Sequence, residues 1–240
     1  MAENKIVSLQ NARVKQVVAL QQKSAERRKQ GLFVVEGIRE LQHCLEAGFN
    51  INSIFFCPEL TDANPLPQLS ENIAAYEVSP EVYEKMAYRG TTEGVIAIVQ
   101  ARQLRLRDLQ LKKQPLLMVL ESVEKPGNLG AILRSADAAG ADAVIVCDPL
   151  TDLYNPNLIR SSIGAIFSVP CVACSSDDCI NYLKLNNIKI LTAQLQDSKL
   201  YYDTDMTCGT AIIMGTESTG LTEVCAKQPM HISVFLCSDN

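Results

Sequence analysis

The sequence lacks three features that mark common classes of protein: a long apolar run, a set of histidines and a glycine-rich phosphate-binding motif. Its longest apolar stretches, such as Leu116–Leu120 and Ala143–Cys147, hold five to eight residues. A membrane-spanning helix needs about 20. The first residues, MAENKIVSLQN, contain no apolar signal-peptide core. We therefore expect a cytoplasmic protein that contacts no membrane.

The shortage of histidine disfavours a zinc site, because the chain has only two. Cys171 and Cys174 form a C-x-x-C with Cys179 five residues later, which is half of a metal-binding pattern. No second cysteine pair or suitably spaced histidine follows. The nine cysteines are odd in number, and four of them lie in apolar runs: Cys44, Cys57, Cys147 and Cys208. We interpret them as reduced, mostly buried thiols and predict no metal.

Neither G-x-G-x-x-G nor G-x-x-x-x-G-K-[ST] occurs, so an ordinary nucleotide-binding α/β enzyme is disfavoured. The chain does have enough apolar material for a core, since 47% of its 240 residues are hydrophobic and 20% are charged. This composition disfavours disorder and fits one large domain or two modest ones.

Charge is divided unevenly along the chain, although the net charge is only −5. Residues 1–114 carry 15 lysines and arginines against 13 acidic residues, whereas residues 115–240 carry 7 against 14. A local basic patch can hold a polyanion even on an acidic protein, because phosphate contacts act at short range. The alternative is a set of solvated helix faces. The candidate RNA contacts in the first half are Arg13, Lys15, Arg27, Arg28, Lys29 and Arg39.

Hydrophobic spacing predicts a small α/β domain at residues 1–100, followed by a basic linker at 101–115. Val14, Val17 and Leu20 share one helix face, and that helix is expected to run to Gly31. Further helices are predicted at 39–47 and 79–86, and strands at 32–36, 51–57 and 94–100.

Residues 116–240 alternate between apolar strands and helices, which predicts a parallel sheet covered by helices on both faces. Ligands of such sheets bind at the carboxyl ends of the strands. Chemistry is therefore expected in the loops after Leu120, Ala193 and Gly215. The predicted strands are 116–120, 143–147, 169–173, 189–193 and 211–215, with helices beginning near Asn128, Asn157 and Asp177.

The loop after the first of these strands carries two polar residues of interest. Asn128 is expected to cap the following helix, and Arg134 lies six residues later, where an exposed arginine can bind a phosphate. The alternative for Arg134 is an ordinary surface position.

Two later loops complete the set. One contains Arg160 and the small residues Ser162 and Gly164, which suit close packing of a helix. The other is a polar strand-to-helix turn from Gly215 to Thr222, with Thr222 as the expected helix cap. Its backbone groups are available to a ligand.

Together the three loops resemble the ordered motifs of the SpoU family of RNA ribose 2′-O-methyltransferases, in the SPOUT superfamily. The first half resembles the substrate-binding domain of that family, and the resemblance covers most of the chain. It rests on Ser8-Leu9-x-Asn11, Phe33-Val34-x-Glu36-Gly37 and Thr92-x-Gly94-Val95, and on the motifs Asn128-x-Gly130-x3-Arg134, Arg160-x-Ser162-x-Gly164 and Gly215-x-Glu217-x2-Gly220-Leu221.

The resemblance implies an α/β fold whose C-terminal segment forms a deep trefoil knot. It implies homodimers that bind S-adenosylmethionine in the knotted loops and methylate a ribose 2′-OH, in ribosomal RNA rather than transfer RNA. The residues it assigns are Arg134, Asn128 and Glu217 for catalysis, Ala193, Gly215, Glu217, Gly220 and Leu221 for the cofactor, and Arg160 and Ser162 for RNA, besides the basic residues named above.

Two roles stay open for Arg134. A ribose hydroxyl is a poor nucleophile, so the site has to help remove its proton while aligning the oxygen with the methyl group. Arg134 is either the base, or it binds the phosphate and the 2′-oxygen while the proton leaves by another route, since a guanidinium is a reluctant proton acceptor. Neither role requires a metal.

The chain departs from the family after the third motif. The family continues with an Ile-Pro-Met strand and a Ser-Leu-Asn that opens its last helix, whereas this chain reads Gln228-Pro229-Met230 and lacks Ser-Leu-Asn. We expect a truncated or altered end here. This departure favours an alternative function, a catalytically silent RNA-binding protein of the same fold.

Overall fold

The computed structural model describes residues 5–61, 73–88, 93–194, 199–216, 218–227 and 232–234. Its residues group into two compact units. The N-terminal unit comprises residues up to 102 together with Tyr154–Ser168, and the C-terminal unit comprises Gln103–Leu153 and the residues from Val169 onward. The domain boundaries at residues 100 and 115 stay a prediction.

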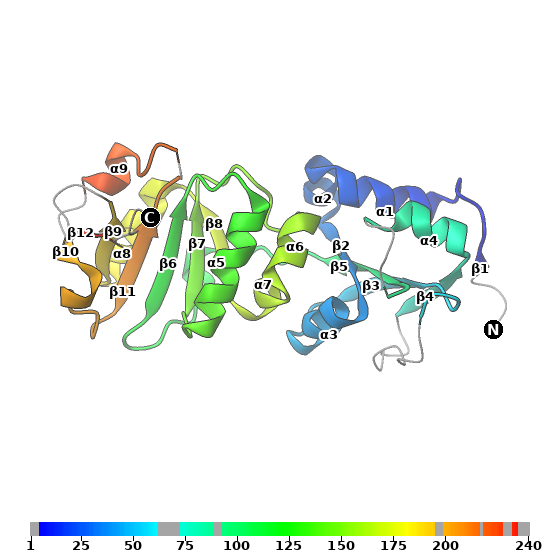
Figure 1. Ribbon diagram of the computed structural model, residues 1–240, viewed down its shortest axis with the longest axis horizontal. Helices are drawn as coiled ribbons and strands as arrows, with labels where there is room; N and C mark the ends of the chain where they lie inside the picture. Colours follow the sequence, from blue (N-terminus) through cyan, green and yellow to red (C-terminus); the bar gives the residue numbers. More distant parts are fainter. Residues whose placement is uncertain are drawn as a thin grey trace, which may run out of the picture. The chain divides into compact units, whose positions relative to one another are not determined.

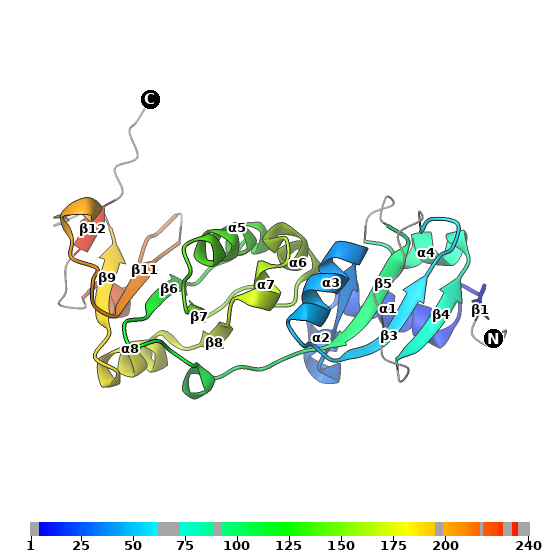
Figure 2. The ribbon, with the colours of Figure 1, turned by 90° about the horizontal axis from the view of Figure 1, so that it is seen from below.

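The N-terminal unit is built on a sheet whose described strands run in the order β1-β4-β3-β5-β2. Helices α1 and α4 lie side by side on one face of this sheet, and α3 lies on the other (Figures 1 and 2). The elements are β1 (Lys5–Ile6), α1 (Ala12–Gln22), α2 (Ser24–Gln30), β2 (Leu32–Glu36), α3 (Ile38–Glu46), β3 (Ile51–Phe56), β4 (Ala74–Val78), α4 (Pro80–Met86), β5 (Val95–Gln100), α6 (Pro156–Ser162) and α7 (Ala165–Ser168).

The core of this unit confirms the predicted helix face, because Val14, Val17 and Leu20 are fully buried against the sheet. The single basic helix that we expected up to Gly31 is wrong, however. It breaks at Lys23, whose backbone is extended (φ −120°, ψ 111°), and continues as α2. Gly31 then ends α2 in the left-handed conformation with φ +64°.

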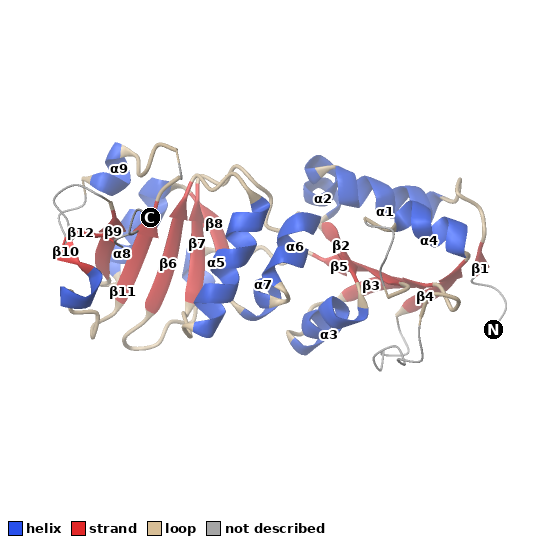
Figure 3. Cartoon of the chain, in the orientation of Figure 1, coloured by secondary structure: helices blue, strands red, loops and turns tan. Residues whose placement is uncertain are grey.

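The C-terminal unit is built on a parallel sheet whose described strands run in the order β10-β12-β9-β11-β6-β7-β8 (Figure 3). Helix α5 covers one face and α8 the other (Figure 2). The elements are η1 (Leu106–Asp108), β6 (Leu116–Glu121), α5 (Pro126–Ala138), β7 (Ala143–Cys147), β8 (Cys171–Cys174), α8 (Ser176–Leu185), β9 (Lys189–Ala193), β10 (Lys199–Leu200), η2 (Tyr201–Asp203), β11 (Thr210–Met214), α9 (Glu223–Ala226) and β12 (Ile232–Val234).

These strands confirm the predicted α/β fold with a parallel sheet, and β7 and β9 have the bounds read from the sequence. The prediction that Asn128 caps α5 is wrong. The helix begins two residues earlier, at Pro126. Proline is favoured at the first helical position, because the backbone N–H that it lacks would have no partner within the helix. The knot stays a prediction. No helix of the described residues is both long and apolar enough to span a membrane.

Candidate functional site

The carboxyl ends of β6, β11 and β9 form one edge of the C-terminal sheet. The parallel register pairs Met214 with Leu120 and Ile213 with Thr192. The same register places Gly215 level with Glu121 on one side, and on the other side it places Met214, the residue before Gly215, level with Ala193. This edge is the place where the sequence predicted ligand binding.

Glu121, the last residue of β6, is the central polar group of this edge, although the sequence analysis did not single it out. It is only 2% exposed. Its Oε2 accepts a hydrogen bond of 2.8 Å from the Thr222 backbone N–H, and its Oε1 accepts one of 2.7 Å from the Thr222 hydroxyl. The Ser176 hydroxyl also lies 3.0 Å from Oε1. Glu121 thus joins three segments that are far apart in the sequence.

The protonation of Glu121 follows from these contacts. Burial disfavours its charged form, but the hydrogen bonds from the Thr222 hydroxyl and N–H, Cys225 and Ser176 outweigh burial and hold the pKa of Glu121 below its ordinary value. The residue is therefore a carboxylate at neutral pH. Thr222 is the N-cap residue of α9, as the sequence predicted, but its side chain makes no capping hydrogen bond because its hydroxyl is bound to Glu121.

The turn after β11 is held closed by its own backbone. Thr216 and Gly220 exchange two hydrogen bonds of 3.0 and 3.1 Å. A Cβ on Gly215 would lie 2.2 Å from the carbonyl carbon of Gly220, so only glycine fits there. Gly220 itself has φ +70°, and Leu221 packs against the core. The structure therefore brings together four of the predicted cofactor residues at one edge: Ala193, Gly215, Gly220 and Leu221. Glu217 lies outside the described residues.

Asn128 and Arg134 are both exposed on α5. Six residues correspond to about one and two-thirds turns of a helix, so the two side chains point from different faces. Within the described part of the chain, the Arg134 guanidinium makes no hydrogen bond or ion pair. The structure does not bring Arg134 into contact with the four cofactor residues.

Most of the basic residues that we predicted to contact RNA are exposed, and one is not. Lys15, Arg28 and Lys29 are exposed on α1 and α2, and the guanidinium of Arg13 stacks over the Tyr76 ring at 4.4 Å. Arg39, with 57% of its side chain exposed, lies 3.6 Å from Glu40.

Arg27 corrects the prediction, because it is only 5% exposed. Its guanidinium donates to the backbone carbonyls of Leu20 and Gln21 at 2.5 and 3.0 Å. These carbonyls belong to the last turn of α1, where no further backbone N–H of the helix reaches them. Arg27 therefore joins α1 to α2 and is not offered to RNA.

Ser162 corrects the prediction as well. It is fully buried on α6, and its hydroxyl donates to the Ile159 carbonyl at 2.7 Å. The nearby Gly164 has φ +90°, and a Cβ there would lie 2.6 Å from the His43 ring. These small residues allow α6 and α7 to pack closely within the N-terminal unit, which is the packing role that the sequence left open for them.

Arg160 is exposed at the mouth of a cavity in the N-terminal unit, with a volume of about 360 Å³. Three carboxylates share the lining with Arg160, those of Glu36, Glu40 and Glu93. Acidic side chains thus surround Arg160, in contrast to the exposed lysines and arginines of α1 and α2.

Comparison with known proteins identifies the family. A model of the SpoU rRNA methylase family matches residues 115–234. The chain belongs to this family. A model of the MRM3-like substrate-binding domain matches residues 11–97. Both matches confirm the resemblance found in the sequence.

Relatives of this SpoU chain are similar over nearly its whole length. It is 27% identical over 217 residues to the 23S rRNA (guanosine(2553)-2′-O)-methyltransferase RlmP of Bacillus subtilis, covering 90% of this chain and 84% of that protein. It is 31% identical to an RNA 2′-O ribose methyltransferase of known structure, with a TM-score of 0.83 over 98% of this chain and 91% of that one. An rRNA methyltransferase from Sinorhizobium meliloti with bound AdoMet is 25% identical, with a TM-score of 0.86 over the same shares.

Proposed function

We propose that this SpoU chain transfers a methyl group from S-adenosylmethionine to a ribose 2′-OH of ribosomal RNA. The observation that carries the proposal is the sheet edge at which Ala193, Gly215, Gly220 and Leu221 converge. Its support from outside the chain comes from RlmP, a 23S rRNA 2′-O-methyltransferase, and from the AdoMet-bound relative.

The residues at this edge fit a polar cofactor. Thr192, one residue before Ala193, has a buried hydroxyl with no hydrogen-bond partner among the described residues. Such a group costs about 1–3 kcal/mol unless a partner is supplied. The Gly215–Gly220 turn brings backbone groups close together, where a side chain would fill the space. S-adenosylmethionine, when bound there, supplies the electrophilic methyl group.

Arg134 acts in this proposal as a clamp and not as a base. A guanidinium is a reluctant proton acceptor. Arg134 is exposed, so its N–H donors are available to a ligand. A charged guanidinium binds phosphate and the 2′-oxygen through fixed N–H donors. Asn128 and Glu217 are proposed to complete the polar set.

The exposed basic residues Arg13, Lys15, Arg28 and Lys29 are proposed to hold structured RNA. Arg39 and Arg160 add to this surface, whereas Arg27 and Ser162 are left out because they are buried. We further propose that the chain works as a homodimer in the cytoplasm, and that its RNA is ribosomal rather than transfer RNA.

Methyl transfer from labelled S-adenosylmethionine tests this function directly. The wild-type chain is incubated with ribosomal RNA and, separately, with transfer RNA, and the product is digested to locate 2′-O-methylated nucleotides. We expect label in ribosomal RNA, a loss of at least about 100-fold in Arg134→Ala, and partial activity in Arg134→Lys.

Arg107→Ala provides a matched control. Arg107 is an arginine of the same unit with 74% of its side chain exposed, and its Nε lies 4.0 Å from Asp108 Oδ1. The variant should retain full activity. Label found only in transfer RNA would mean that the substrate is transfer RNA and not ribosomal RNA. No label in any RNA, with RNA binding intact, would favour the catalytically silent RNA-binding protein. Full activity of Arg134→Ala would overturn the site assignment.

A further inference from the structure

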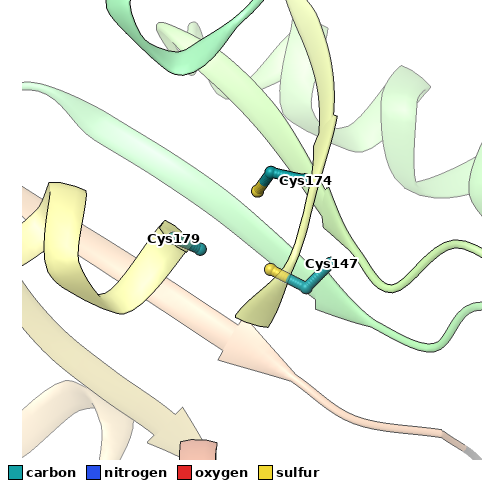
Figure 4. Close-up of side chains that lie close together, drawn as sticks. All are labelled: Cys147, Cys174 and Cys179. Atoms are coloured by element: carbon teal, nitrogen blue, oxygen red, sulfur yellow. The ribbon is translucent and has the colours of Figure 1, made fainter. Parts of the chain in front are cut away.

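Three cysteines meet at the same carboxyl edge of the C-terminal sheet, where Cys147 is the register partner of Glu121. Cys147 is the last residue of β7, Cys174 is the last residue of β8, and Cys179 lies in the first turn of α8. Cys147 and Cys174 are register partners on adjacent parallel strands. The three Sγ atoms all lie within 4.8 Å of one another, and Figure 4 shows the side chains converging.

This group differs from the C-x-x-C that is visible in the sequence. Cys171 and Cys174 are three residues apart on a strand, so their side chains point to opposite faces of the sheet. The structure replaces Cys171 by Cys147, which comes from the neighbouring strand. No spacing rule could have predicted this combination, because the two strands are joined only by the fold.

The three sulfurs lie in surroundings that suit a bound cation. Cys147 and Cys179 are fully buried, and Cys174 is half-buried, which gives an ion a way in. Asp148 directly follows Cys147 and Asp178 directly precedes Cys179, so two carboxylates lie on the same segments as the sulfurs. Metal-bound cysteines are thiolates, so three of them beside two carboxylates need a cation to balance their charge.

We propose that Cys147, Cys174 and Cys179 form a three-thiolate site for a thiophilic metal ion, Zn²⁺ or Cu⁺. Because no two of the sulfurs are more than 4.8 Å apart, an ion at their centre lies at most about 2.8 Å from each sulfur. Zinc–thiolate bonds of about 2.3 Å require each sulfur to move inward by at most about half an ångström. Soft thiolate ligands select these two ions. Zn²⁺ keeps a fourth position for water, whereas Cu⁺ is satisfied by three sulfurs.

The proposal differs from our expectation of a chain without metal, and none of the three cysteines is among the residues proposed for methyl transfer. Ser176 lies between Cys174 and Cys179 in the sequence and binds the Asp148 carboxylate through its hydroxyl at 2.7 Å. A metal that joins β7, β8 and α8 would therefore stabilise the start of α8. The ion binds the folded chain only, so it raises thermal stability in proportion to its affinity.

Metal binding to the full-length chain tests the proposal. The reduced protein is freed of metal with a chelator and dialysed against Zn²⁺ or, without oxygen, against Cu⁺, and bound metal is measured by elemental analysis. We expect one ion per chain in the wild type and at least about 10-fold weaker binding in Cys174→Ala. The matched control is Cys171→Ala, on the same strand and equally half-buried, and it should bind like the wild type. Whether Zn²⁺ or Cu⁺ binds shows which of the two ions the site takes.

A second measurement needs no variant. Bound metal should protect Cys147, Cys174 and Cys179 from alkylation in the wild type, with Cys208, which is exposed, labelled equally with and without metal. The proposal is overturned if the reduced wild type binds neither ion, if Cys171→Ala and Cys174→Ala lose binding equally, or if metal protects none of the three. Loss of two hydrogens from a chain that binds no metal would indicate a disulfide instead.

Discussion

Among the described residues, Arg27 in the N-terminal unit and Glu121 in the C-terminal unit are buried charged side chains that join elements, and the two differ in how far along the chain their partners lie. Arg27 bonds the carbonyls of Leu20 and Gln21, seven and six residues away. Glu121 bonds Ser176 and Thr222, 55 and 101 residues away. Arg27 thus fixes a single joint between two helices, whereas Glu121 fixes the edge at which the proposed cofactor loops converge.

The comparison teaches which charged residues are left for ligands. In both units a buried charged residue is hydrogen-bonded, and charged residues that follow it within three positions are exposed. Arg28 and Lys29 follow Arg27 and are exposed, and Glu124 follows Glu121 and is exposed. Charged residues that stabilise the fold and charged residues that are available to a ligand are therefore close in the sequence but differ in burial.

The largest expected effect in this comparison follows Glu121→Gln. An amide nitrogen would face the N–H of Thr222, and the charge-assisted hydrogen bonds would be lost. We expect the free energy of unfolding to fall by about 2–4 kcal/mol. Urea unfolding measures this, with the exposed Glu124→Gln as control, which should change it by less than about 0.5 kcal/mol. If both variants changed the free energy of unfolding equally, the hydrogen bonds of Glu121 would not be what holds the site together.

The difference between wild type and Glu121→Gln should also depend on pH. The pKa of Glu121 in the folded chain lies below its ordinary value. Its stabilisation is therefore fully present above the ordinary pKa of a glutamate, about 4.3, and is lost as the pH falls through the folded value. Urea unfolding of both proteins between pH 7 and pH 3 should show the gap narrowing only at the acid end. A gap that is constant with pH would mean that Glu121 is not charged when folded.

A smaller loss is expected for Arg27→Met, which keeps the apolar stem and removes the donors. Two buried carbonyls lose their partner, so we expect about 1–3 kcal/mol less stability in urea unfolding. RNA affinity, measured by filter binding, should stay unchanged for the folded variant. If Arg27→Met bound RNA more weakly while its free energy of unfolding stayed unchanged, Arg27 would be an RNA contact and not a structural residue.

The smallest effect on stability, within about 0.5 kcal/mol, is expected when Arg28 and Lys29 are both changed to alanine. Their effect should instead appear in RNA binding. Affinity should fall, and the slope of log affinity against log salt should become shallower by about 1–2, because two phosphate contacts are removed. An unchanged slope would place the RNA on another surface.

Much of the fold could be predicted from the sequence, because apolar runs such as Ala143–Cys147 and Lys189–Ala193 are local signals. The third motif loop also lies at the predicted sheet edge, through Gly215 and Gly220. Contacts that depend on burial could not be predicted. Arg27 and Arg28 look alike in the sequence, and only the packing of α2 decides which one is buried.

The same limit applies to residues that the fold brings together from distant segments. Glu121 is an ordinary end of an apolar run until Thr222 and Ser176 are placed beside it. Cys147 is an ordinary core cysteine until β8 pairs with β7. In each case the informative partner lies on another strand or helix, at a separation that no local pattern reports.

The central claim is that the edge formed by Ala193, Gly215, Gly220 and Leu221 binds S-adenosylmethionine. Calorimetric titration of S-adenosylmethionine and S-adenosylhomocysteine into the full-length chain tests it most directly. We predict binding at micromolar strength, retained in Arg134→Ala and lost in Glu121→Gln. A chain that is folded by circular dichroism but binds neither compound would contradict the claim and favour the catalytically silent RNA-binding protein.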